Sequence, residues 1–163
     1  MVDFEKLKKI CKLIRYDILT STTEAKSGHP TTSLSAVELM ATLYFGGFLH
    51  LDLKDPKNHI NDRVVFSKGH ASPLIYSLYH AAGVISYPEL MQLRKINSDL
   101  EGHPTFRFKY ADVATGSLGQ GLSAGVGMAL GIRLRSTIDN RKLSEYAHRW
   151  GDKRIIKIIK NII

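Results

Sequence analysis

Apolar side chains recur with helical spacing at the start of the chain. They fall every three or four residues between Phe4 and Ile18, the period of one face of an α-helix. Asp3 stands directly before them and is a residue type that caps helix N-termini. The pattern predicts a helix that begins at Asp3 and ends at Ser27–Pro30, where glycine and proline both interrupt helical backbone.

A second apolar series predicts another helix, followed by a strand. Ser35 and Glu38 have the spacing of a capping box, and the series from Leu34 to Phe45 ends at a pair of glycines. After a polar loop, Arg63–Phe66 is short, β-branched and bounded by polar residues. We expect this segment to be a buried strand.

The remaining pattern predicts three more helices. One begins near Pro73, and another begins at Ser86, where Ser86 and Glu89 form a second capping-box candidate around Pro88. Residues 98–120 have the glycine, proline and aromatic content of a loop, and a helix of small residues follows over 120–136. Helices together with a short buried strand predict an α/β architecture that is helix-rich.

Three histidines share one local setting. They lie in Ser27–Pro30, Ser67–His70 and Glu101–Pro104, and each follows a glycine at the end of a predicted element. Imidazole donates to phosphates and hydroxyls and moves protons near neutral pH, while glycine permits close approach of a ligand. Histidines that serve only a turn, and a zinc site, are the competing interpretations. The zinc interpretation lacks the paired helical spacing of metal-binding histidines.

A glycine-rich turn, Thr115–Leu122, enters the last predicted helix. Such a turn suits the close approach of a cofactor ring or an anion to a helix N-terminus. It has neither the Gly-Lys-Ser/Thr of a Walker A loop nor the dinucleotide fingerprint. The competing interpretation is tight helix packing, in which Gly125, Gly127 and Gly131 would share.

Composition excludes a disordered tail and a coiled-coil rod, because 44% of the 163 residues are hydrophobic and 23% are charged. The net charge of +8 is unevenly distributed. Residues 1–132 hold 14 basic and 12 acidic side chains, whereas residues 133–163 hold nine basic and three acidic. We therefore predict a nearly neutral domain over residues 1–133 with a basic tail over 134–163, and no nucleic-acid partner.

Cys11 is the only cysteine, which excludes an intrachain disulfide and indicates a reducing compartment. The first residues lack the basic and apolar regions of a signal peptide. Val113–Ile132 is uncharged over the length of a membrane span but contains six glycines, too many for one inserted helix. We expect a cytoplasmic protein without a membrane partner.

Taken together, these segments resemble the N-terminal, diphosphate-binding half of the transketolase family. The stretches that match, in the family's order, are Ser27–Leu34, Phe66–Ala71, Glu101–Pro104, Ala114–Leu122 and Gly127–Ala129. The resemblance implies a doubly wound parallel sheet covered by helices, of which this chain holds an incomplete part. Deoxyxylulose-phosphate synthase, which uses the same cofactor on pyruvate, is the related alternative, and its strand-end motif lacks the Ser-Lys-Gly-His-Ala form found here.

The resemblance implies thiamine-diphosphate-dependent transfer of a two-carbon ketol unit from a ketose phosphate to an aldose phosphate. His29 resembles the histidine that faces the substrate hydroxyls and carbonyl, and His103 the one that bonds the donor's terminal hydroxyl. His70 resembles the histidine that contacts the cofactor diphosphate. The cofactor-binding turn is Gly116, Ser117 and Leu118, in which Gly116 and Leu118 match positions that line the aminopyrimidine ring.

The sequence departs from the family after Leu134. The family holds Mg²⁺ or Ca²⁺ with a downstream Gly-Asp-Gly and Asn, oxygen ligands that suit such cations. Only Gly151-Asp152-Lys153 lies at a comparable distance, so we assign no metal ligand to this chain. The short N-terminal segment before the first motif is similar to that of split transketolases, in which the two halves are separate chains. In the family, the Glu that activates the cofactor lies on the other half, across a dimer interface.

We therefore expect an N-terminal fragment that is inactive and marginally stable alone. Its tail pairs isoleucines with lysines, as in an amphipathic helix or in a reading-frame accident. A separate C-terminal half is the partner that a split enzyme would require. A non-catalytic remnant that acts as an interaction module is the alternative outside enzymes.

Overall fold

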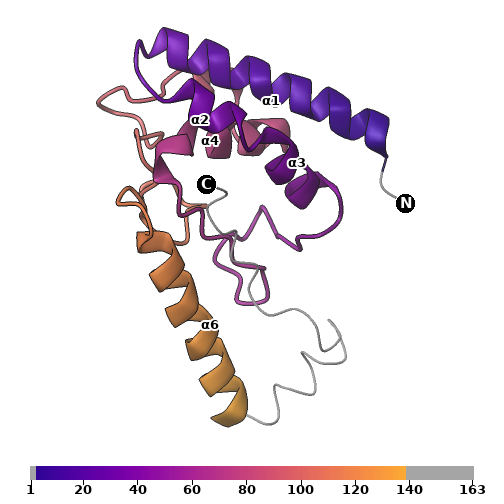
Figure 1. Cartoon of the computed structure of the whole chain (residues 1–163), viewed down its shortest axis with the longest axis vertical. Coiled ribbons are helices and arrows are strands. Elements are labelled where there is room, and N and C mark those ends of the chain that lie inside the picture. The colour runs from indigo at the N-terminus through magenta and orange to yellow at the C-terminus, as the bar shows by residue number, and fades with distance from the viewer. Residues whose placement is uncertain (1–2, 139–163) are drawn as a thin grey trace.

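The computed structural model describes residues 3–138 of the chain. Their order is α1 (Phe4–Glu24), α2 (Pro30–Leu34), α3 (Val37–Phe45), η1 (Gly69–Ala71), α4 (Ser72–Ala81), α5 (Tyr87–Leu90) and α6 (Gln120–Ile138). Helix α1 crosses over α2, α3 and α4 and contacts all three (Figure 1). The helix-rich character predicted from the sequence is confirmed for these residues.

Two predicted helix starts are confirmed by their capping bonds. The Asp3 carboxylate accepts a hydrogen bond from the Lys6 backbone N–H at 3.0 Å. At α5, the Ser86 hydroxyl accepts from the Glu89 N–H while the Glu89 carboxylate accepts from the Ser86 N–H. These reciprocal bonds satisfy two N–H groups that a helix start would leave unpaired.

The capping box predicted at Ser35 and Glu38 is wrong. The Ser35 hydroxyl donates instead to the Thr32 carbonyl at 2.8 Å, because a short helix that the pattern missed, α2, ends there. Pro30 occupies the first turn of α2, a position where its missing N–H has no effect. Glu38 is then free to pair with Arg15 of α1 at 2.7 Å.

The predicted strand Arg63–Phe66 is buried at its end but is not a strand. Val65 and Phe66 are 1% and 9% exposed, yet among residues 3–138 only Phe66 has β pairing, as an isolated bridge. The Phe66 carbonyl accepts a hydrogen bond from the Thr115 hydroxyl at 2.9 Å, which ties this segment to the glycine-rich turn. The doubly wound sheet does not occur within the described residues.

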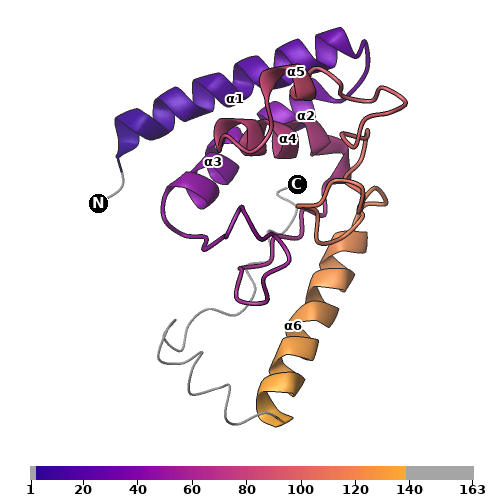
Figure 2. The ribbon, with the colours of Figure 1, turned by 180° about the vertical axis from the view of Figure 1, so that it is seen from behind.

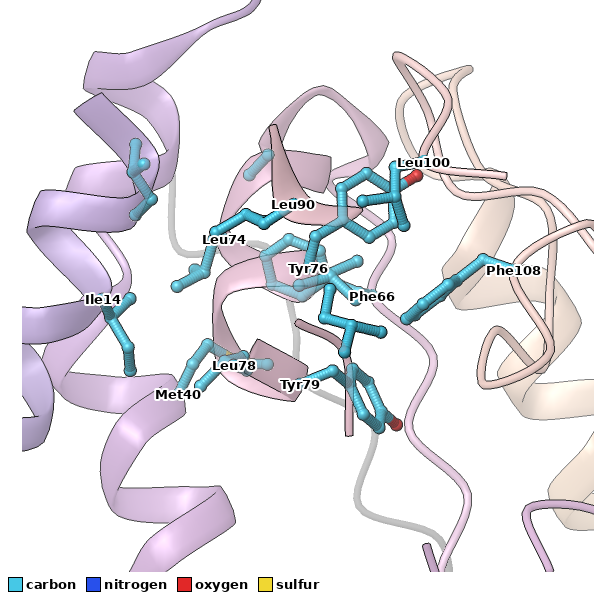
Figure 3. Close-up of a cluster of buried hydrophobic side chains, with 14 of the residues drawn as sticks. Ile14, Met40, Phe66, Leu74, Tyr76, Leu78, Tyr79, Leu90, Leu100 and Phe108 are labelled. Carbon is cyan, nitrogen blue, oxygen red and sulfur yellow. The ribbon is translucent and has the colours of Figure 1, made fainter. Parts of the chain in front are cut away.

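The core lies between α1, α3 and α4, with loop residues closing its far side. Figure 3 shows Ile14 and Met40 facing the side chains of α4, whose Tyr76 and Tyr79 contact Phe108 from the loop before α6. The labelled residues that the structure buries most completely are Ile14, Met40, Leu74, Tyr76, Leu78 and Leu90. Burial of each such side chain contributes about 1.5–3 kcal/mol, so this cluster fixes where η1 and the start of α4 lie.

Helix α6 extends away from the other helices (Figures 1 and 2). Its first turn packs on the buried Ser67, but much of its apolar surface is open. The apolar residues of α6 that are more than two-fifths exposed are Leu122, Val126, Leu130, Ile132 and Leu134. Within the part of the chain that the structure describes, no helix has the length and apolarity to cross a membrane.

A buried ion-pairing contact joins α1 to α4. Oδ2 of Asp17, which is fully buried, lies 2.7 Å from Nδ1 of His80. The other carboxylate oxygen has no hydrogen-bond partner. Burial raises the pKa of Asp17 above its ordinary value, against the opposing effect of the His80 hydrogen bond.

Replacing Asp17 by Asn should stabilise the chain relative to wild type by an amount that grows as the pH rises. Because the pKa of Asp17 in the folded chain is raised above 3.8, its ionisation opposes folding. That effect is absent below the unfolded pKa and complete above the folded one. Urea unfolding of both proteins, from about pH 3 to about pH 6, measures the difference.

The matched control is Asp55→Asn, which changes an exposed carboxylate and should give a difference that hardly varies with pH. A difference for Asp17→Asn that is equally flat would contradict the assigned cause.

Candidate functional site

The three histidines of the Gly-His segments meet in one cluster. The rings of His29 and His70 have centroids 5.1 Å apart, and those of His70 and His103 are 4.7 Å apart, both in edge-to-face geometry. We call these three residues the histidine cluster. Segments separated by more than thirty residues in the sequence thus converge on one place, as functional histidines would require.

Two of the three histidines lie at the start of a helix, and His103 lies in the loop between α5 and α6. His29 precedes the first residue of α2, makes no side-chain capping bond and is exposed. His70 lies within η1, immediately before α4. Gly28, at φ +128°, is in a conformation that other residues rarely adopt, and it lets the chain turn from α1 into His29.

Backbone packing joins the histidine cluster to the glycine-rich turn. A Cβ on Gly69 would lie 2.6 Å from the Thr115 carbonyl carbon, so only glycine allows this approach. The Thr115 N–H donates to the Pro104 carbonyl at 3.1 Å. Residues 69, 104 and 115 therefore hold their three segments together at backbone level.

Of the predicted cofactor-binding turn, the structure brings only Gly116 against the histidine cluster. A Cβ on Gly116 would lie 3.3 Å from Cδ2 of His103. Ser117 and Leu118 are exposed, and Leu118 retains 69% of its accessible surface. The turn thus presents one glycine to the cluster and two side chains to the surrounding surface.

The competing interpretation of tight packing fits Gly121 in the first turn of α6 and fails at Gly127 and Gly131. Gly121 packs on Ser67, where a Cβ would lie 2.6 Å from the Ser67 Cα. Gly127 and Gly131 have no atom within 4 Å of the position where a Cβ would stand. Tight packing therefore explains Gly121 but not the two later glycines.

Two hydroxyls of α4 support the loop that carries His103. The Ser72 hydroxyl donates to the Gly102 carbonyl at 2.8 Å, and the Tyr76 hydroxyl donates to the Glu101 carbonyl at the same distance. Sequence reasoning missed both residues, because they lie 25 or more positions from the loop they hold. The helical spacing of α4 could at most have marked Tyr76 as buried.

The electrostatics of the cluster favour a neutral His103. Partial burial lowers the pKa of His103 from its ordinary value, and the nearby His70, Arg94 and His29 lower it further. A neutral imidazole has one donor and one acceptor nitrogen. His103 can therefore bond a hydroxyl group and exchange a proton with it at neutral pH.

The described part of the chain has no cluster of side chains that could hold a metal ion. Among residues 3–138, no three or more His, Cys, Asp or Glu side chains are placed to hold a metal ion. The Asp152 considered from the sequence lies outside the described residues.

A glycine pair on α6 tests the packing beneath the site. Gly121→Ala should lower the free energy of unfolding by about 1–3 kcal/mol, because its Cβ meets the Ser67 backbone. Gly127→Ala should raise it by about 0.5–1 kcal/mol, because the position is helical and open. Denaturant unfolding of both variants measures the contrast, and equal effects would contradict the packing described.

Imidazoles gathered beside a glycine turn that leads into a helix form the kind of site that binds a phosphorylated ligand. The family model described as "Transketolase, thiamine diphosphate binding domain" matches residues 6–150. The chain belongs to the transketolase family.

Similar proteins support the same assignment. Human transketolase is 49% identical over 125 residues, which cover 77% of this chain and 20% of that protein. Transketolase of Cereibacter sphaeroides is 34% identical over 131 residues, with 78% and 20% covered. The crystal structure of Campylobacter jejuni transketolase matches with a TM-score of 0.72 at 33% identity, covering 78% of this chain and 20% of that one. The chain spans about a fifth of the length of these relatives.

Proposed function

We propose that this chain supplies the histidine-bearing wall of a transketolase site, in which thiamine diphosphate is bound and a two-carbon ketol unit passes from a ketose phosphate to an aldose phosphate. The observation that carries the proposal is the convergence of His29, His70 and His103 beside Gly116. The family match adds the cofactor class. A structure of Pichia stipitis transketolase in complex with sedoheptulose 7-phosphate indicates the substrate class.

The residues present fit the cofactor. Gly69 and Gly116 leave no side chain between the glycine-rich turn and the imidazoles, and imidazole N–H groups are suitable donors to a diphosphate. When bound, thiamine diphosphate supplies the nucleophilic carbon and the electron sink of the reaction. The protein's contribution is binding, orientation and proton transfer.

Each histidine takes a different part in this proposal. His70, which lies in η1 after the buried residues 65–67, donates to the diphosphate. His103, held neutral, bonds the terminal hydroxyl of the donor, and His29, which is exposed, faces the substrate hydroxyls and carbonyl. Gly116 and Leu118 line the aminopyrimidine ring, and Ser117 belongs to the same cofactor-binding turn.

The proposal requires protein beyond the described residues. The relatives are about five times longer than the matched segment, and Leu118 and the apolar face of α6 are exposed. We propose that residues 1–133 form the diphosphate-binding part, with 134–163 as a basic segment. We also propose that a C-terminal transketolase half completes the site and a parallel sheet within a dimer.

No step is assigned to Mg²⁺ or Ca²⁺. A cytoplasmic location remains a prediction from the single cysteine.

Calorimetric titration of the full chain with thiamine diphosphate and Mg²⁺ tests the proposal, alone and with the C-terminal four-fifths of the human relative. We expect binding heat and ketol transfer only in the presence of that partner, because the chain holds one wall of the site. No heat in either case would contradict cofactor binding and favour the non-catalytic interaction module. Turnover of pyruvate instead of a ketose phosphate would favour the synthase alternative.

His103→Ala should raise the KM for the ketose donor by about 10-fold or more while changing the affinity for thiamine diphosphate less than threefold. A hydrogen bond to a substrate hydroxyl from a neutral imidazole contributes about 1–2 kcal/mol, and His103 is not the residue assigned to the diphosphate. Steady-state kinetics and calorimetry of the assembled enzyme measure the two effects. His59→Ala, which changes an exposed histidine of the loop after α3, is the control, and an equal loss of both affinities would contradict the role given to His103.

A further inference from the structure

Arg94 adopts a conformation that a side chain rarely takes. Its φ of +61° is in the left-handed region, which is unfavourable for residues other than glycine. The Arg94 N–H donates to the Leu100 carbonyl at 2.8 Å. This bond joins the two ends of the segment between Arg94 and Leu100, directly before the loop that carries His103.

The guanidinium of Arg94 covers Gly102. A Cβ on Gly102 would lie 2.7 Å from Cζ, 2.9 Å from Nη2 and 3.0 Å from Nε of Arg94, so the planar group lies over the position where a side chain would begin. On its other side, Gly102 is bound through its carbonyl by the Ser72 hydroxyl. The peptide immediately before His103 is therefore held between α4 and Arg94.

The charge of Arg94 is not neutralised by its neighbours. The ion pairs in this region join Lys95 to Glu24, and Arg107 to both Asp99 and Glu101. Within residues 3–138, no ion pair or side-chain hydrogen bond engages the Arg94 guanidinium. The Arg94 guanidinium is thus a solvent-exposed cation that lies over Gly102, the residue before His103.

We propose that Arg94 is a positioning residue, whose guanidinium plane fixes the Gly102 turn and so places a positive charge next to the peptide that carries His103. This inference rests on the proposed function for its catalytic meaning, but its geometry belongs to the chain alone. The fixed turn sets the His103 ring against His70 and Gly116. The charge disfavours protonation of His103, so the ring keeps an acceptor nitrogen for a substrate hydroxyl.

The groups that act on His103 can be named for each neighbouring element. They are His29 before α2, His70 in η1 and Arg94 after α5, all of which lower its pKa together with burial. Gly116 in the glycine-rich turn is uncharged. Glu101, two positions earlier, is held by Arg107 and Thr105, so Arg94 is the permanent cation of the set.

The test is a proton-NMR titration of the histidine Cε1–H signals in the full chain, which requires neither cofactor nor partner. Arg94→Gln should raise the proton affinity of His103 by roughly 3- to 10-fold, because a neighbouring positive charge is removed. Lys95→Gln, which removes the adjacent cation of the Lys95–Glu24 pair, should leave it unchanged. An unchanged His103 titration in Arg94→Gln would overturn the proposal.

A second variant keeps the result interpretable if Arg94→Gln unfolds. Arg94→Gly removes the guanidinium and also relieves the left-handed backbone, so it should fold and show the same rise in proton affinity. In the assembled enzyme, both variants should move the acidic limb of the kcat/KM profile to higher pH. If the histidine titration changes as expected and the assembled enzyme shows no ketol transfer, the positioning role stands and the proposed function fails.

Discussion

The site depends on the close approach of two backbones at Gly69 and Thr115. No side chain fits between them, and the Thr115 hydroxyl binds the Phe66 carbonyl just before the approach. This contact brings His70 and Gly116 to the same place. Because both segments are also anchored to the core, through Phe66 and through the loop that α4 supports, the geometry follows from packing and not from any ligand.

Signals within one helical turn predicted the helices, and they failed where a residue outside that turn competes for the same group. The cap at Asp3 and the box at Ser86 and Glu89 are confirmed because all their partners lie within one helical turn. The box at Ser35 fails because α2 competes for the same hydroxyl. The burial of Phe66 was predictable from β-branched neighbours, whereas its hydrogen-bond partner, 49 residues away, was not.

The candidate site shows the same division. Repeated Gly-His pairs marked the three imidazoles because glycine next to a functional side chain is a local signal. Ser72, Tyr76 and Thr115 carry no such signal, since a hydroxyl in a helix or turn usually bonds its own neighbours. Which hydroxyl supports which loop is decided by tertiary packing, and a single sequence does not contain that pairing.

The charge of the histidine cluster and the exposure of its surroundings agree with a chain that supplies one side of a larger site. Partial burial and the neighbouring His70, Arg94 and His29 lower the pKa of His103, so its imidazole offers one donor and one acceptor to a polar ligand. Leu118 and the apolar residues of α6 are exposed. Covering such apolar surfaces lowers the free energy of the protein. A polar histidine cluster beside an exposed apolar helix face agrees with the proposal that further protein completes the site, and the chain matches a fifth of the human relative's length.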